Sequence, residues 1–169
     1  LYSDGIPVGG AHITSDIAHG LTASIADSER LKTLYGSALA TISDEHEYID
    51  VPIVGEQGGK GEQQVTRAHL INIIQARLEE TFEMINQGLV DSGIDAAQCR
   101  RVVLTGGGSL MPGVQDLAQR ILARQVRCAQ ALKVKGLPDA TSGPAFAVSM
   151  GLIRYCLLYT SDAADEVDR

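Results

Sequence analysis

The sequence feature that most constrains the fold is an apolar strand pattern followed directly by a glycine turn. Residues 102–105 are apolar up to a threonine, and Gly106, Gly107 and Gly108 come next. Consecutive glycines permit positive φ angles and let backbone amides approach a flat or anionic ligand. With a helical pattern beginning at residue 114, the segment predicts an α/β unit and a candidate nucleotide site. A plain tight corner is the alternative interpretation of the same residues.

The composition is typical of one globular core built from aliphatic side chains. Of the 169 residues, 44% are hydrophobic and 21% are charged, and the chain contains no Trp and two Phe. The formal net charge is −7, and the 14 Lys and Arg residues are scattered, so nucleic acid is not expected as a partner. The sequence has no apolar run of the roughly 18 residues that a membrane-spanning helix needs.

Neither the cysteines nor the histidines predict a metal site. Cys99, Cys128 and Cys156 lie far apart and form no CxxC pair, which indicates thiols in a reducing compartment. His12 and His19 share one predicted helix, but no third ligand is near them in the sequence. We therefore expect no metal ligand.

Helical and strand patterns alternate along the chain, which favours an α/β domain with a smaller inserted lobe. The helix at 24–35 has Ser24 or Asp27 as its N-cap and Gly36 at its C-terminal stop. The strand at 48–54 and a polar loop at 55–61 indicate a hairpin. The other expected helices are at 11–21, 66–88, 114–122 and 143–155, and the other expected strands are at 6–8, 102–105 and 125–128.

Glu29 and Lys32 lie three positions apart on the predicted helix at 24–35, and therefore share one of its faces. Most pairs of this kind are solvated ion pairs. By themselves the two residues support that interpretation.

Four segments of the chain match one family pattern in order. They read PVGGAHITSDIA at residues 7–18, SERLKTLYG at 28–36, LTGGG at 104–108 and GLPD at 136–139. Together they closely resemble FtsA, a family of bacterial cell-division proteins that are actin-like and bind ATP. The glycine segment alone is shared with actin, Hsp70 and sugar kinases, whereas the first two segments point to FtsA in particular.

The resemblance extends over most of the chain and implies an actin-like α/β fold of the ribonuclease-H type, incomplete at its N-terminus. Residues 1–35 and 99–155 would form the nucleotide-binding lobe, which resembles subdomain 2A of the family. Residues 36–98 would form the inserted smaller α+β subdomain, which resembles subdomain 2B. Residues 156–169 have neither periodicity nor a cap, and we interpret them as a doubtful, non-native tail.

The resemblance also implies an ATP site in the first of these lobes. Gly106, Gly107 and Gly108 would lie against adenine and the α-phosphate, with backbone amides as donors. Glu29 would accept hydrogen bonds from the ribose hydroxyls, and Lys32 would donate to the ribose or flank the base. The family's phosphate loops and catalytic carboxylates have no counterpart in this sequence. We therefore expect weak ATP binding, no hydrolysis by this chain, and Mg²⁺ only in the full-length protein.

Proteins of the FtsA family link polymers of the tubulin-like protein FtsZ to the membrane, and they polymerise themselves. The resemblance therefore implies scaffolding rather than catalysis, on the cytoplasmic side of the bacterial inner membrane at the division septum. Expected partners are the FtsZ C-terminal peptide, further copies of the chain in actin-like filaments, and other divisome proteins. The inner membrane is expected as a partner through a segment absent from this sequence.

In the family, the lobe that corresponds to residues 36–98 receives the FtsZ peptide, and the predicted helix at 66–88 is the implied platform. For each polar residue along that helix, an ordinary surface role is the plainer interpretation. The candidates are Arg67, Asn72, Arg77 and Asn86. Two alternatives stay open for the whole chain: another actin-like filament protein, of the MreB or pilus-assembly type, or one half of a sugar-kinase-like enzyme.

Overall fold

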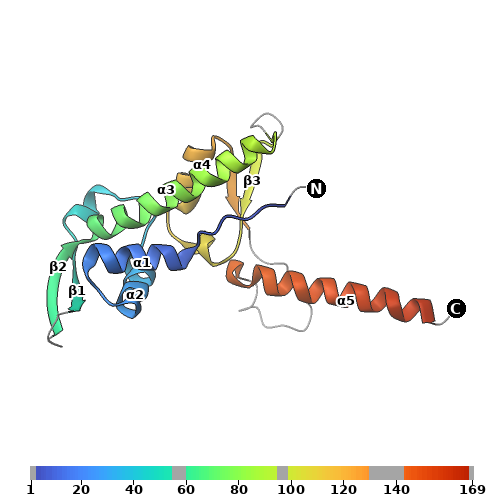
Figure 1. Cartoon of the computed structure of the whole chain (residues 1–169), viewed down its shortest axis with the longest axis horizontal. Helices are drawn as coiled ribbons and strands as arrows, with labels where there is room; N and C mark the ends of the chain where they lie inside the picture. Colours follow the sequence, from blue (N-terminus) through green and yellow to red (C-terminus); the bar gives the residue numbers. More distant parts are fainter. Residues whose placement is uncertain (1–2, 55–59, 95–98, 130–142, 168–169) are drawn as a thin grey trace. The chain divides into compact units, whose positions relative to one another are not determined.

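The computed structural model describes residues 3–54, 60–94, 99–129 and 143–167 (Figure 1). The chain divides into two compact units. Unit 1 consists of Leu1–Val102 and Met111–Val126, and unit 2 consists of Val103–Leu110 and Arg127–Arg169.

Unit 1 combines helices with one antiparallel hairpin. Its helical elements are α1 (Gly10–Leu21), α2 (Ile25–Tyr35), the 3₁₀ turn η1 (Ile42–Glu45), α3 (Arg67–Asp91) and α4 (Val114–Leu122). The hairpin strands are β1 (Tyr48–Val54) and β2 (Lys60–Thr66), paired from Tyr48 opposite Thr66 to Val54 opposite Lys60. The long helix α3 packs against both α1 and α4 (Figure 1).

The core of unit 1 is aliphatic, as the composition predicts. Helices α1, α2 and α3 and strand β1 bury the side chains of Ile13, Ile17, Leu21, Leu31, Ile49, Val51, Leu70 and Ile74. The α1 residues in this group recur at the helical period, so one face of α1 is apolar. Burial of that face against α2 and α3 holds the three helices together.

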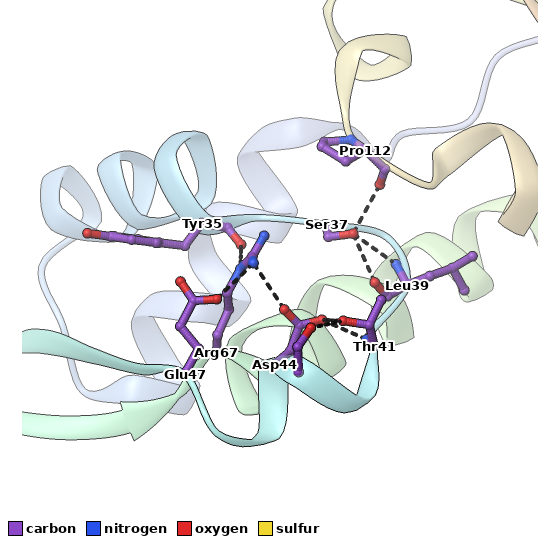
Figure 2. A network of polar contacts seen from close by, with 9 residues as sticks. Tyr35, Ser37, Leu39, Thr41, Asp44, Glu47, Arg67 and Pro112 are labelled. Carbon is purple, nitrogen blue, oxygen red and sulfur yellow. Dashed lines mark hydrogen bonds and ion pairs between the residues drawn. The ribbon is translucent and has the colours of Figure 1, made fainter.

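The segment after α2 is held against the start of α4. The amide of Ala38 donates to the carbonyl oxygen of Pro112 at 2.8 Å, and Ser37 Oγ donates to the same oxygen at 3.3 Å (Figure 2). Gly113 follows with a φ of 75°, and a Cβ there would lie 3.4 Å from Leu39. The left-handed backbone favours glycine at the N-cap of α4.

Strands β3 (Arg101–Leu104) and β4 (Gln125–Cys128) form a second two-stranded sheet. The amide of Gln125 donates to Arg100, and the amide of Ala129 donates to Leu104. Both residue numbers rise together along the two strands, so the pairing is parallel. Helix α4 is the connection between them, which makes a βαβ unit.

Unit 2 contains the 3₁₀ turns η2 (Gly107–Leu110) and η4 (Pro144–Phe146) and the helix α5 (Ala147–Val167). The two turns pack against each other, and η4 leads directly into α5. Met150 of α5 is buried, whereas its neighbours Val148 and Leu152 are exposed.

Several predicted elements are confirmed at their predicted bounds. Helix α2 begins after Ser24, whose Oγ accepts a hydrogen bond from the amide of Asp27, and it ends at the C-cap Gly36. Strands β1 and β4 and helix α4 also match their predicted ranges. Local caps and turn residues were sufficient to locate these ends.

Other elements differ from the prediction. Residues 3–9 are neither helix nor strand, so the strand expected at 6–8 is wrong. Helix α3 continues three residues beyond the predicted end at 88, and α5 continues to Val167, through most of the segment interpreted as a tail. The GLPD segment at 136–139 lies outside the described residues.

Candidate functional site

The glycine turn that carries the predicted nucleotide site lies in unit 2. Gly106 has a φ of 89°, a conformation that strains any residue with a Cβ. Its amide donates to the carbonyl oxygen of Pro144 at 3.0 Å, and its own carbonyl accepts from Ser109 Oγ at 2.8 Å. The start of the turn is therefore fixed by hydrogen bonds on both sides.

Gly107 and Gly108 present two backbone amides that donate to no part of the described chain. A Cβ built on either glycine would meet no atom within 4 Å, so the space beside both residues is open. Unpaired amides on a glycine turn form the kind of concave donor site that binds anions. The turn can therefore donate hydrogen bonds to a phosphate oxygen, or lie against the face of a purine ring.

The sequence predicts a strand, a glycine turn and then a helix from residue 114, and the helix begins at that residue. Residues Gly107–Leu110 form the 3₁₀ turn η2, and α4 follows from Val114. The residues between them separate the turn from the helix, because Pro112 has no amide hydrogen to donate and Gly113 has a left-handed backbone.

Glu29 and Lys32 belong to unit 1, where they join two α1 residues in what we name the α1–α2 polar cluster: Gly10, Thr14, Glu29 and Lys32. Lys32 Nζ lies 2.6 Å from Glu29 Oε2. The Glu29 side chain is 55% exposed, whereas that of Lys32 is 14% exposed. The ion pair that the spacing predicted is thus formed, with the lysine enclosed and the carboxylate at the surface.

The Lys32 ammonium uses each of its three hydrogens within the cluster. Its acceptors are Glu29 Oε2 at 2.6 Å, Thr14 Oγ1 at 2.8 Å and the carbonyl oxygen of Gly10 at 3.2 Å. An ammonium group has three donors and no acceptor. Lys32 can therefore donate to a ligand only by giving up one of these bonds.

Glu29 is an ionised acceptor with one oxygen still open. Its Oε2 accepts from Lys32 and from Thr14 Oγ1, and these two hydrogen bonds, that of Lys32 first, lower the pKa of the carboxyl group. Its Oε1 accepts no hydrogen bond from the described residues. A carboxylate oxygen of this kind can accept hydrogen bonds from ligand hydroxyls.

Sequence reasoning missed Thr14 and Gly10 as members of the cluster. Thr14 is 3% exposed and lies on α1 among the buried residues Ile13 and Ile17. A polar residue within the apolar face of a helix is the one sequence signal that could have identified it. Gly10 contributes only a backbone carbonyl, which leaves no signal in the sequence.

Arg67, one of the predicted peptide contacts, lies at the centre of an internal network (Figure 2). Its Nη1 contacts Asp44 and Glu47, each at 3.0 Å, and its Nε donates to the carbonyl oxygen of Tyr35 at 3.1 Å. Asp44 is buried and also accepts from the amide and hydroxyl of Thr41. Arg67 therefore ties α3 to η1 and to the end of α2.

Arg77 is likewise engaged within unit 1. Its Nε and Nη2 donate to the two carboxylate oxygens of Asp16, and its Nη1 donates to Glu80. This bidentate pair joins α3 to α1. On the same helix Asn72 is exposed and Asn86 is half-buried. The engagement of both arginines favours a structural role for them, and the peptide-binding role of the four residues stays a prediction.

Within the described ranges, no group of three His, Cys, Asp or Glu side chains is placed to hold a metal ion. No helix there is both long enough and apolar enough to cross a membrane. None of Cys99, Cys128 and Cys156 forms a disulfide.

Comparison with known proteins gives a family match over most of the chain. The family model described as "Cell division protein FtsA" matches residues 1–151. Relatives with that name include those of Agrobacterium fabrum, Pseudomonas aeruginosa and Escherichia coli, which are 44%, 34% and 31% identical. The alignments cover 92%, 93% and 89% of this chain and 35%, 37% and 37% of the relatives. The chain therefore spans little more than a third of their length.

Two crystal structures of MreB5 from Spiroplasma citri have the same fold. The structure bound to AMPPNP matches with a TM-score of 0.64 over 95% of this chain and 47% of the other. The structure bound to ADP matches with a TM-score of 0.67 over 94% and 47%. Both are 14% identical in sequence, so they show the fold alone. The expectation of an incomplete actin-like α/β fold is confirmed.

Proposed function

The chain belongs to the FtsA family of cell division proteins, and we propose that it is part of an ATP-binding scaffold that tethers FtsZ polymers to the cytoplasmic membrane at the division septum. The family match over residues 1–151 carries this proposal. The scaffold acts by recruitment rather than by turnover. Neither alternative function, a different actin-like filament protein or a sugar kinase, has support beyond the shared fold.

The two candidate groups support the ATP-binding part of the proposal. Gly107 and Gly108 offer unpaired amides beside open space, and Glu29 offers an open carboxylate oxygen. By its own chemistry, the amide pair of unit 2 suits the phosphate or base of ATP, and the Glu29 carboxylate of unit 1 suits a ribose hydroxyl. Lys32 borders the ribose and keeps Glu29 ionised. Both MreB5 structures contain an adenine nucleotide, which supports the choice of ligand.

Titration of the 169-residue chain with ATP, followed by amide NMR, tests this part. We expect the signals of Gly107 and Gly108 to shift, with weak affinity. Gly107→Ala should not unfold the chain, because a Cβ there would contact no other protein atom. It should weaken ATP binding about fivefold, because the same Cβ would crowd the bound nucleotide. Gly5→Ala is the matched control, since a Cβ there also contacts nothing. Unshifted glycine signals at saturating ATP would contradict the assignment.

The FtsZ-tethering part assigns peptide binding to residues 36–98, with α3 as the platform. The support is the family membership together with the exposed polar side of α3, which includes Asn72. A fluorescently labelled FtsZ C-terminal peptide should bind the folded chain saturably, and a scrambled peptide should not. Anisotropy is the measurement. Failure of a folded sample to bind would count against residues 36–98 as the binding lobe.

The remaining parts of the proposal concern the whole protein. Mg²⁺ and hydrolysis belong to the full-length protein, so the chain itself should release no phosphate from ATP above the rate of buffer. Self-association into actin-like filaments, contacts with other divisome proteins and attachment to the inner membrane complete the proposed role. A phosphate-release assay with MgATP measures the first point, and turnover by the purified chain would contradict it.

A further inference from the structure

Thr14 is a buried hydroxyl at the centre of the α1–α2 polar cluster. Its side chain is on α1, whereas Glu29 and Lys32 are on α2. Oγ1 of Thr14 lies 2.5 Å from Glu29 Oε2, 2.8 Å from Lys32 Nζ and 3.0 Å from the carbonyl oxygen of Gly10. Three polar groups therefore meet at one hydroxyl.

The chemistry of these groups decides the direction of each bond. A hydroxyl has one hydrogen and two lone pairs, and an ammonium can only donate, so Lys32 donates to Thr14. The single hydrogen of Thr14 then has two acceptors within reach, Gly10 and Glu29. The carboxylate is nearer and carries charge, which makes it the stronger acceptor. The carbonyl of Gly10 still receives a hydrogen bond from Lys32.

We propose that Thr14 is a positioning residue of the nucleotide site, whose hydroxyl fixes the Glu29 carboxylate with Oε2 bound and Oε1 open. The open oxygen is then presented, in one orientation, to a ligand with two neighbouring hydroxyl groups. This inference rests on the proposed function, because the ligand is the ribose of the bound nucleotide. It adds a specificity, namely that the site prefers ribose to 2′-deoxyribose.

The preference follows from the fixed geometry. A carboxylate held by two bonds loses little conformational freedom when a ligand hydroxyl binds its remaining oxygen. The 2′-deoxyribose lacks one hydroxyl, so this acceptor gains less from it. A Glu29 side chain freed from Thr14 could rotate, and it would distinguish the two sugars less well.

Three substitutions separate positioning from general packing. Thr14→Val removes the hydroxyl at nearly constant shape, and Thr14→Ser restores it. Thr33→Val is the matched control, because Thr33 Oγ1 donates to the backbone carbonyl of Glu29 and not to its carboxylate. Thr14→Ala replaces Thr14→Val if circular dichroism shows that the valine variant does not fold.

The first measurement is the affinity of the 169-residue chain for ATP relative to 2′-dATP. We expect Thr14→Val to lower this ratio about threefold or more, and Thr14→Ser and Thr33→Val to preserve it. An unchanged ratio in Thr14→Val would overturn the inference. A wild-type chain that binds both nucleotides equally would instead contradict the ribose role of Glu29 in the proposed function.

The second measurement needs no nucleotide, so it tests the role of Thr14 whether or not the chain binds ATP. The ¹³C signal of the Glu29 carboxyl group is followed by NMR during an acid titration. Loss of the Thr14 hydrogen bond should raise the pKa of Glu29, because that bond helps to lower it. Thr14→Ser and Thr33→Val should leave the midpoint at the wild-type value. A wild-type midpoint in Thr14→Val would show that the hydroxyl does not hold the carboxylate.

Discussion

At the scale of single residues, the enclosure of Asp44 has the clearest energetic consequence. Its side chain is 4% exposed. Oδ2 accepts from the amide and the hydroxyl of Thr41 at 2.6 and 2.7 Å, and Oδ1 lies 3.0 Å from Arg67 Nη1 (Figure 2). A buried carboxylate is tolerated because these donors replace the water that it loses. Replacing the carboxylate by a neutral amide therefore leaves the donors on one side without an acceptor.

We expect Asp44→Asn to lower the free energy of unfolding by about 1–3 kcal/mol, because the amide group sets a donor against the donors of Thr41 or Arg67. Urea unfolding followed by circular dichroism measures the change. Asp50→Asn is the control: Asp50 is exposed and its partner Gln64 can re-pair with an amide, so a change within about 0.5 kcal/mol is expected. Equal effects at both positions would contradict the enclosure argument.

The same carboxylate predicts a pH dependence. The hydroxyl of Thr41 first, then its amide, and then the charge of Arg67 hold the pKa of Asp44 below its ordinary value of 3.8. Since the folded pKa is lower than the unfolded one, the stabilisation is complete above the unfolded value and is lost as the pH falls through the folded value. The difference in unfolding free energy between wild type and Asp44→Asn should be constant above pH 3.8 and should shrink below it. A difference that grows in acid would contradict this sign.

At the scale of elements, α2 carries Glu29 and Lys32, and its ends determine where these residues lie. Ser24 caps the first turn by accepting a hydrogen bond from the amide of Asp27 at 3.1 Å. Gly36 ends the helix, and its amide donates a hydrogen bond to the carbonyl oxygen of Lys32. Capping satisfies amides that otherwise lack partners in the first turn. The position of the polar cluster thus depends on a cap that none of its members provides.

Ser24→Ala should lower the free energy of unfolding by about 1 kcal/mol, because the first turn of α2 loses its side-chain acceptor. Ser24→Thr keeps a hydroxyl and should cost clearly less. Urea unfolding of both variants measures the difference, and heteronuclear NMR of Ile25 and Asp27 should show fraying in the alanine variant alone. An alanine variant as stable as the threonine variant would mean that the cap contributes nothing.

Local signals explain which elements the sequence could predict. The ends of α2 were predictable because Ser24 and Gly36 act through bonds to their near neighbours. The end of α3 was not, because Gly88 resembled a stop. A glycine within a helix costs only about 1 kcal/mol, and the packing of this long helix outweighs that. The helix ends just before Gly93, which has a φ of 72° and whose amide donates a hydrogen bond to the carbonyl oxygen of Val90.

In the candidate site too, the contacts within one helix were predictable from the sequence, and those between helices were not. The pair of Glu29 and Lys32 was predictable from a spacing within one helix. Thr14 lies 15 positions from Glu29 on another helix, so its role depends on how α1 and α2 pack. That packing is a long-range property of the core, and no local pattern near Thr14 specifies it.

At the scale of the whole molecule, the two units differ in how much of their chain is buried. Among the unit 2 residues whose burial is described, Met150 alone is buried, whereas unit 1 holds the core cluster of α1, α2, β1 and α3. Apolar burial is the main source of stability in a folded domain. Unit 1 therefore has the larger share of the stabilising interactions.

Hydrogen exchange should separate the units, with amides of α5 exchanging far faster than those of α1 and α3. Residues 151–157 of α5 are exposed, so this part of the helix can open without uncovering a core, whereas the opening of α1 or α3 exposes buried side chains. Exchange followed by mass spectrometry on the intact chain is the measurement. Protection of α5 equal to that of α1 would contradict the unequal burial.

The network around Arg67 holds several parts of the stretch between α2 and α3 against the start of α3. The backbone amide of Arg67 bonds to Glu47, its Nε to Tyr35 and its Nη1 to Asp44, so one residue at the start of α3 gathers three places along the incoming chain. The chain therefore leaves and re-enters the helical part of unit 1 at one residue. Because β1 within this stretch buries Ile49 and Val51 in the core, an insertion or deletion is tolerated only where it leaves that strand in place.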